Sequence, residues 1–289
     1  MAENTSENPL SKILINRRNF LKIFGLGAVV VATSGNPFAT VEAQAEDINI
    51  FVKIINETRE QYDAAHFLFP VSQTRRLPED FPKDSAEVPL VTPNIHTGAT
   101  EMGDTGIKIA QLIQPAVQQL FTEVKKAGLS PKIVSGYRTF AEQNRTFNNY
   151  VAAEQPFCKT DAEAEEKANR YSAKAGFSEH HLGLALDIMD GSFAGKPGGQ
   201  WDEARKNFNQ GFYGWLRENS HLSGFALSYP TGADNIQDAK PGCGYPSAEP
   251  WHIRFVGRQL AQYLQDNDYL NPQNSVTLNK ILLAGEKVK

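Results

Sequence analysis

Apolar residues occupy every second position of the segment 184–189, at Leu184, Leu186 and Ile188. A period of two is typical of a β-strand with one apolar face. Asp187 lies between these residues in the sequence, so its side chain is expected on the opposite face. Three further short segments are predicted as strands, over residues 132–135, 225–229 and 250–255.

A helical period marks residues 115–127, where apolar side chains return every three or four positions, at Val117, Leu120, Phe121 and Val124. Pro115 suits the first helical position, and Gly128 ends the helix. Thr139 is followed three residues later by Glu142, a spacing that predicts a capping box at the start of the next helix. Further helices are predicted over residues 48–65, 160–173, 212–221, 253–264 (with a strand end at its start) and 278–283.

This mixture of short strands and helices predicts an α+β fold. The chain has 289 residues, of which 40% are hydrophobic and 21% charged, as in ordinary soluble globular proteins. The formal net charge is −4 and no long basic run occurs, so nothing in the sequence indicates a nucleic-acid partner or an anionic surface. Two cysteines are too few for a disulfide scaffold or a four-cysteine metal module.

The two cysteines, Cys158 and Cys243, leave two alternatives. A thiolate is a good zinc ligand, but neither cysteine has a C-x2-C partner, which disfavours a cysteine metal site. In an exported protein the pair could form one disulfide. The sequence leaves this pairing open, because it does not give the distance between the two Cα atoms.

Residues 1–45 are predicted to lie outside the fold. Arg17 and Arg18 precede an apolar run over residues 23–32, which is too short to span a bilayer, and small residues at 43–45 suit signal cleavage. The segment R-R-x-F-L-K resembles the twin-arginine export signal, which implies the twin-arginine export machinery as a partner. The mature protein is therefore expected in the periplasm or cell envelope.

Two segments flank the predicted catalytic domain. Residues 46–99 begin with a helix and continue as a proline-rich irregular stretch. That stretch is either an arm wrapped on the domain or a mobile lead. Residues 271–289 are predicted as a C-terminal tail with one short amphipathic helix.

Chemistry-bearing residues gather in two stretches, Ser178–Asp187 and Glu249–His252. Together they supply two imidazoles, a carboxylate that can bind a metal and a second, spare carboxylate. A catalytic zinc site uses three protein ligands and leaves the fourth position to water. We therefore predict His180, Asp187 and His252 as metal ligands and Glu249 as the general base.

The spacing of these residues sets two geometric conditions. Seven extended residues would place His180 and Asp187 roughly 23 Å apart, too far for one metal ion. The chain must fold back between them, and Gly183 is the residue that can adopt a positive φ there. A regular strand would put Glu249 and His252 on opposite faces, so a bend or bulge is expected between them.

The same stretches carry a family resemblance. S-E-H-H-L-G-L-A-L-D at Ser178–Asp187 and E-P-W-H at Glu249–His252 resemble the two signatures of the D-alanyl-D-alanine carboxypeptidases related to the vancomycin-resistance enzymes. These are LAS metallopeptidases, named for lysostaphin, the D-Ala-D-Ala peptidases and sonic hedgehog. Ser135–Arg138 with Gln143 is similar to a third element, S-G-Y-R-x-x-x-x-Q, and residues 215–230 to a fourth.

The resemblance runs from about residue 100 to about residue 270 and implies a D,D-carboxypeptidase domain over 100–270. It implies a small, mainly antiparallel sheet that bears the site, with helices around it, as in the hedgehog/DD-peptidase fold. It also implies one Zn²⁺ per chain and peptidoglycan stem peptides ending in D-Ala-D-Ala as the substrate. The expected reaction is removal of the terminal D-alanine.

By resemblance, Arg138 binds the substrate and steadies the oxyanion, and Gln143 and Ser178 lie at the substrate. Gln143 could instead be a helix-surface residue, and Ser178 a turn or capping residue. His181 is expected beside the site or on the surface, because adjacent residues point apart in an extended chain. A fourth protein ligand would leave no position for water.

Alternative functions remain open from the sequence. The same metal set would serve a D,D-dipeptidase or an L,D-endopeptidase acting on the same stem peptides. A member of the hedgehog branch could be a non-catalytic, zinc-containing wall-binding module. The presence of Glu249 favours an enzyme, because a structural metal site needs no base.

Overall fold

The computed structural model describes residues 37–62, 66–72, 74–93, 106–170, 172–193, 199–207, 209–230, 249–267, 269 and 277–287, with the backbone alone for 37–47. Arg17, Arg18 and Cys243 lie outside these ranges, so the export signal and the disulfide remain predictions. Among the described residues, none of the helices is both long and apolar enough to cross a bilayer.

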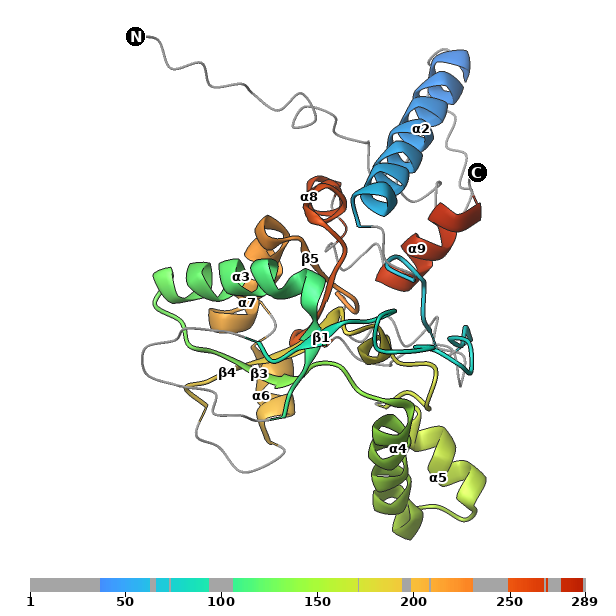
Figure 1. The fold of residues 1–289 in the computed structure, drawn as a ribbon, viewed down its shortest axis with the longest axis vertical. Coiled ribbons are helices and arrows are strands. Elements are labelled where there is room, and N and C mark those ends of the chain that lie inside the picture. Colours follow the sequence, from blue (N-terminus) through green and yellow to red (C-terminus); the bar gives the residue numbers. More distant parts are fainter. Residues whose placement is uncertain are drawn as a thin grey trace.

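Four antiparallel strands form the central sheet, in the order β3-β4-β6-β5 (Figure 1). Their bounds are Pro131–Ser135 for β3, Ala185–Asp190 for β4, Phe225–Leu227 for β5 and His252–Phe255 for β6. The strands coincide with the four predicted segments to within three residues. The prediction of an α+β fold with a small antiparallel sheet is confirmed.

The period-two pattern of residues 184–189 predicted a strand with one apolar face, and β4 has such a face. Leu186 and Ile188 are completely buried in the hydrophobic core. Asp187 points to the other face, where it pairs in register with His252 of β6. The register of the two central strands therefore brings together residues that are 65 positions apart in the chain.

Helices surround the sheet, with two of them projecting at one end (Figure 1). The helix pair α4 and α5 packs together below the sheet in that view, while α2, α8 and α9 gather at the opposite end. The bounds are Pro37–Gln61 (α2), Gln114–Lys126 (α3), Phe140–Glu154 (α4), Asp161–Ala168 (α5), Gly199–Lys206 (α6), Gly211–Asn219 (α7), Arg258–Asp266 (α8) and Leu278–Lys287 (α9).

Local signals predicted the best-defined helices well. The four apolar residues of α3 are all buried, and Thr139 and Glu142 form the complete capping box of α4. Several helices differ in their bounds from those predicted. α2 begins at Pro37 and not at residue 48, because no helix-breaking residue separates the two positions. α5 ends at Ala168 with Asn169 as its C-cap, and α6 lies where no helix was predicted.

Residues 66–93, called the arm below, pack against the domain with little regular structure. Their buried side chains belong to the main core, and they are Phe67, Leu68, Val71, Leu77, Phe81 and Val88. The short strand β1, Leu90–Val91, pairs antiparallel with β2, Ile109–Ala110. The arm therefore shares one core with the sheet.

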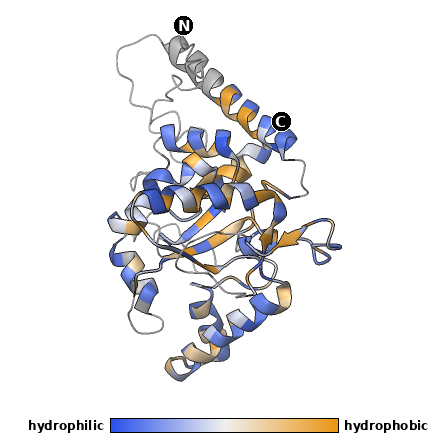
Figure 2. Cartoon of the chain, turned by 60° about the vertical axis from the view of Figure 1, so that its left-hand side comes forward, coloured by the Kyte–Doolittle hydropathy of each residue, from blue (hydrophilic) through white to orange (hydrophobic). Residues whose placement is uncertain are grey.

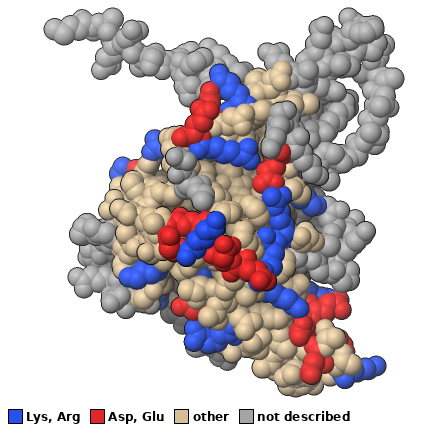
Figure 3. All heavy atoms as spheres, turned by 45° about the vertical axis from the view of Figure 1, so that its right-hand side comes forward, with Lys and Arg blue, Asp and Glu red and all other residues tan. Residues whose placement is uncertain are grey.

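Side-chain polarity follows the layers of the fold. The strands are mostly hydrophobic and many outward helix faces are hydrophilic (Figure 2). Basic and acidic side chains are interleaved on the face shown in Figure 3. Some ion pairs are local in the sequence: Lys53 pairs with Glu57 within α2, and Arg170, just beyond α5, pairs with Glu166.

Candidate active site

His180 lies on a short 3-10 helix, η4 (Glu179–Leu182), directly before β4. The hydroxyl of Ser178 accepts a hydrogen bond from the His180 amide, which caps this turn. Gly183 ends the turn with φ at 67°, so the predicted fold-back at this glycine is confirmed. An extended chain would hold His180 and Asp187 too far apart to share one metal ion. Because of the turn, His180 Nε2 lies 3.2 Å from Asp187 Oδ2.

The orientation of the His180 ring is set by the backbone. Its Nδ1 atom lies 2.7 Å from the carbonyl oxygen of Gly136, so this nitrogen carries the proton and donates. Nε2 is left as the lone-pair nitrogen and points to Asp187. A fixed tautomer of this kind is typical of histidines that bind metals.

His252 points its Nδ1 atom at Asp187, whereas His180 uses Nε2. Its Nδ1 lies 3.0 Å from Asp187 Oδ1, while its Nε2 lies 2.9 Å from Glu179 Oε2. Donor atoms of His180, Asp187 and His252 all lie within 4.8 Å of one another, and all three residues are buried. The structure thus brings together the three residues predicted as ligands.

Glu249 reaches the site through a tight bend. The His252 amide donates to the Glu249 carbonyl at 3.0 Å, which closes a turn over residues 249–252. Glu249 Oε2 consequently lies 3.9 Å from His252 Nδ1, on the same side as the ligand atoms. The expected bend between the two residues is confirmed, and it puts the spare carboxylate beside the metal position.

Arg138 lies at the corner between β3 and α4 and points at the same site. One terminal nitrogen, Nη2, lies 3.2 Å from Asp187 Oδ2. Nη1 donates to Gln143 Oε1 at 2.8 Å and Nε donates to Ser135 Oγ at 2.9 Å. The guanidinium is thus held by three neighbours while remaining partly exposed.

Gln143 has a supporting position. It is 1% exposed, and its amide nitrogen donates to the Ala173 carbonyl at 2.6 Å. Its carbonyl oxygen accepts from Arg138, so both ends of the amide have protein partners. The helix-surface alternative is wrong, because the side chain is buried under Arg138.

His181 is completely buried, so the surface alternative for this residue is also wrong. Its Nδ1 donates to the Arg138 carbonyl at 2.7 Å and its Nε2 accepts from the Gly176 amide. Burial lowers the pKa of His181 to about 4, which keeps the ring neutral. Its hydrogen bonds tie the turn that carries His180 to the corner that carries Arg138.

Two charged residues of the site, Glu179 and Arg254, were not predicted from the sequence. Arg254 is completely buried on β6, and its Nη1 donates to Glu179 Oε1 at 2.9 Å. The other oxygen of Glu179 accepts from His252 and from Ser228 Oγ. The available signal was their position: Glu179 directly precedes His180, and Arg254 lies two residues after His252 on a predicted strand.

The buried charges favour a cation between the carboxylates. Burial alone would raise the pKa of Asp187, but His180 and His252 hold it well below the ordinary value. Burial also opposes ionisation of Glu179, yet Arg254 and His252 lower its pKa to about 2. Burial would lower the pKa of His252, whereas its bonds to Asp187 and Glu179 raise it to about 10. Positive charge is therefore stabilised at His252 Nδ1, whether it is a proton or a metal ion.

The donor set fits a zinc-sized ion. Zinc binds nitrogen and carboxylate oxygen at about 2.0–2.2 Å, which puts neighbouring tetrahedral donors about 3.3 Å apart. His180 Nε2 lies 3.2 Å from Asp187 Oδ2, and His252 Nδ1 lies 3.0 Å from the other oxygen, Asp187 Oδ1. One donor atom from each of the three residues lies within 4.8 Å of the other two. The group consists of two imidazoles, which can bind a metal ion in their neutral form, and one carboxylate. The described residues offer no fourth donor to this group, so one position of a tetrahedral ion is left for water.

The fold and the site together define a class: an α+β protein with a metallopeptidase-type His–Asp–His centre. The family profile described as VanY: D-alanyl-D-alanine carboxypeptidase matches residues 106–258. The chain belongs to this family.

Individual relatives agree with this placement. A D-alanyl-D-alanine carboxypeptidase of Enterococcus faecalis is 34% identical over 178 residues, which cover 60% of this chain and 59% of that protein. The putative carboxypeptidase YodJ of Bacillus subtilis is 33% identical over 153 residues, covering 53% and 48%. The matched region thus spans less than two thirds of the length of either relative.

Two solved structures share the fold. VanYB in complex with D-alanine-D-alanine has a TM-score of 0.52 and 30% identity, over 69% of this chain and 91% of that chain. A mutant of a vancomycin-resistance D,D-pentapeptidase VanY from a VanB-type cassette, in complex with Zn(II), has a TM-score of 0.51 and 29% identity, over 69% and 93%.

Proposed function

We propose that this protein is a zinc-dependent D,D-carboxypeptidase that removes the terminal D-alanine from peptidoglycan stem peptides. The observation that carries the proposal is the convergence of three buried donors, from His180, Asp187 and His252, with Glu249 beside them. The complexes of relatives with Zn(II) and with D-alanine-D-alanine support the choice of metal and substrate.

Zinc, when bound, supplies a Lewis acid and lowers the pKa of a water at the open position. Glu249 accepts a proton from the attacking water and later delivers it to the leaving amine. Its place 3.9 Å from His252 Nδ1 puts its carboxylate next to the ligand atoms without making it one of them. This carboxylate therefore serves as general base and then general acid.

Arg138 is the proposed anchor for negative charge. Its guanidinium is oriented by Ser135 and Gln143 and is partly exposed beside Asp187. It donates to the C-terminal carboxylate of the stem peptide or to the oxyanion that forms in the reaction. Gln143 acts through Arg138, and Ser178 acts as the cap that orients the His180 turn.

The assignment of the ligands is tested by metal analysis. Wild-type mature protein should bind about one zinc per chain, and His180→Ala and His252→Ala should each lose most of it, because two donors rarely hold zinc tightly. His221→Ala is a matched control, since His221 lies on η5 (Ser220–Ser223), outside the ligand group. Full zinc occupancy in both ligand variants would refute the site.

We further propose that residues 1–45 act as a twin-arginine signal and that residues 100–270 form the catalytic domain. The paired arginines, the apolar run and the small residues at 43–45 support the first proposal. Helix α2 continues through residues 43–45 in the full chain, so cleavage there would remove its first turns.

A further inference from the structure

We propose that helix α9 and the arm position the metal ligand His252, through the buried pair Arg254 and Glu179. This inference rests on the proposed zinc site and extends it to two segments outside the family match of residues 106–258. It gives the arm and the C-terminal helix a role in metal affinity.

Arg254 joins four parts of the molecule. Its Nη1 donates to Glu179 Oε1 at 2.9 Å and to Asn279 Oδ1 of α9 at 3.3 Å. Its Nη2 donates to two carbonyl oxygens of the arm, those of Phe67 at 3.0 Å and Phe69 at 2.9 Å. The guanidinium is completely buried, so these acceptors replace the water that its two terminal nitrogens would otherwise bind, while Nε has no partner among the described residues.

The same network ends at the metal site. Glu179 is 2% exposed, and its Oε2 lies 2.9 Å from His252 Nε2. That contact holds the proton on Nε2 and turns Nδ1 towards Asp187 and the metal position. If Glu179 were displaced, the His252 ring would lose the contact that orients it at Nε2. Nδ1 would then bind the metal ion more weakly.

A second path links α9 to Glu179. The Leu278 amide, at the start of α9, donates to the Ser228 carbonyl at 3.1 Å. The hydroxyl of Ser228 donates to Glu179 Oε2 at 2.6 Å. The first two residues of α9 therefore each bind a partner of Glu179: Leu278 binds Ser228, and Asn279 binds Arg254. Packing of an apolar helix face alone would not require these polar contacts.

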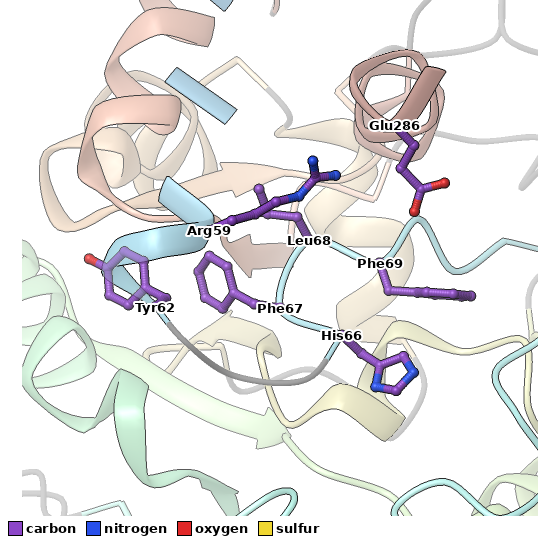
Figure 4. Close-up of a pocket in the computed structure, with 7 residues that line it drawn as sticks. All are labelled: Arg59, Tyr62, His66, Phe67, Leu68, Phe69 and Glu286. Atoms are coloured by element: carbon purple, nitrogen blue, oxygen red, sulfur yellow. The ribbon is translucent and has the colours of Figure 1, made fainter. Parts of the chain in front are cut away.

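The arm is held in place from both sides. Its residues Phe67, Leu68 and Phe69 lie between the C-terminal end of α2, with Arg59 on the helix and Tyr62 just after it, and α9, which carries Glu286 (Figure 4). Together they border a pocket of about 340 Å³. Arg75 of the arm also forms an ion pair with Glu286. The arm carbonyls that accept from Arg254 thus depend on contacts with both helices.

The decisive experiment compares two changes in α9. Asn279→Leu is nearly isosteric but removes the acceptor for Arg254. Ile281→Val is the matched control, because it weakens the core packing of α9 without removing an acceptor of Arg254 or a contact of the arm's Arg75. Zinc dissociation constants are measured by chelator competition, and thermal unfolding of the zinc-free proteins is measured alongside.

Removal of an outer partner of a metal ligand typically weakens metal binding about 10- to 100-fold. Glu179→Gln should fall in that range, and Asn279→Leu should weaken zinc binding about tenfold, with zinc-free unfolding close to that of Ile281→Val, which should keep the zinc affinity of the wild type. Wild-type zinc affinity in Asn279→Leu would overturn the inference, even if its unfolding temperature fell, because Asn279 would then only support the fold. Absence of zinc binding in the wild type would instead refute the proposed function.

Discussion

Each nitrogen of the Arg138 guanidinium has its own acceptor, on Ser135, Gln143 and Asp187. A planar group held in this way presents a fixed edge to a substrate carboxylate, which a flexible ammonium cannot do. The residue is therefore oriented before any substrate arrives. In the proposed reaction, Arg138 would contribute through its fixed geometry as well as through its charge.

We predict that Arg138→Lys folds and binds zinc but loses about 10²-fold or more in kcat/KM, as expected when a positioned donor to the oxyanion or carboxylate is removed. Lysine keeps the charge near Asp187 but cannot bind Ser135 and Gln143 at once. Steady-state kinetics on a peptide ending in D-Ala-D-Ala, with zinc content measured in parallel, gives the result. Kinetics close to wild type would mean that Arg138 serves only as the ion-pair partner of Asp187.

The residues that could be predicted from the sequence are those with a strong spacing pattern. His180, Asp187, His252 and Glu249 belong to two short stretches, and the structure brings them together. The ion pair of Glu179 with Arg254 could not be predicted. Its partners are 75 positions apart, and a charged residue on a strand is usually exposed, so burial was the missing information.

At the scale of elements, two short turns bring the reactive groups together. The η4 turn brings His180 back to Asp187, and the turn over residues 249–252 brings Glu249 alongside His252. The need for both could be predicted, because regular strands would have kept these residues apart. The helix α6 could not, since its sequence has few apolar residues and follows a glycine-rich stretch.

We predict that Gly183→Ala destabilises the fold and disturbs the metal site. Gly183 has φ at 67°, and an added Cβ would lie 3.0 Å from the Ala110 amide nitrogen. Strain of this kind costs about 1–3 kcal/mol. Because the turn carries His180, zinc affinity should fall as well. Thermal unfolding and zinc titration measure the two effects separately.

Gly128→Ala is the matched control for this change. Gly128 also has positive φ, at 77°, but an added Cβ there meets nothing within 4 Å. It should cost about 1–2 kcal/mol from the backbone alone and leave zinc affinity unchanged. Equal zinc affinity in both variants would mean that the η4 turn tolerates the strain without moving His180.

At the scale of the whole molecule, one core joins the arm, the sheet and the C-terminal helix. The sequence predicted each piece as a separate segment, and the arm as either wrapped or mobile. Buried residues such as Phe67 and Leu282 lie more than 200 positions apart, and no local pattern could show that they share a core. Long-range packing of this kind depends on the complete fold.

The proposed export signal lies in the N-terminal segment, and we predict that export depends on Arg17 and Arg18. Changing both to lysine retains the charge but removes the paired guanidinium groups that the twin-arginine signal requires. The precursor should then stay in the cytoplasm while the unaltered chain is exported. Cell fractionation with immunoblotting measures this, and normal export of the double-lysine form would indicate another route.

The most direct test of the account is Glu249→Gln, assayed in two ways on the same zinc-loaded sample. The change is nearly isosteric, so the turn over residues 249–252 should persist, and Glu249 is not one of the three ligands. An amide cannot accept the proton of the attacking water, and general-base contributions are typically about 10²–10⁴-fold. The measurement is mass spectrometry of pentapeptide stems for loss of one D-alanine, with zinc content determined in parallel.

The account predicts that wild-type protein shortens the stems by one D-alanine, whereas Glu249→Gln keeps its zinc and turns over at least about 100-fold more slowly. Loss of zinc from the variant would make Glu249 a ligand and contradict the assigned set. Full turnover with zinc retained would place the base elsewhere, and stems left intact by the zinc-loaded wild type would contradict the carboxypeptidase itself.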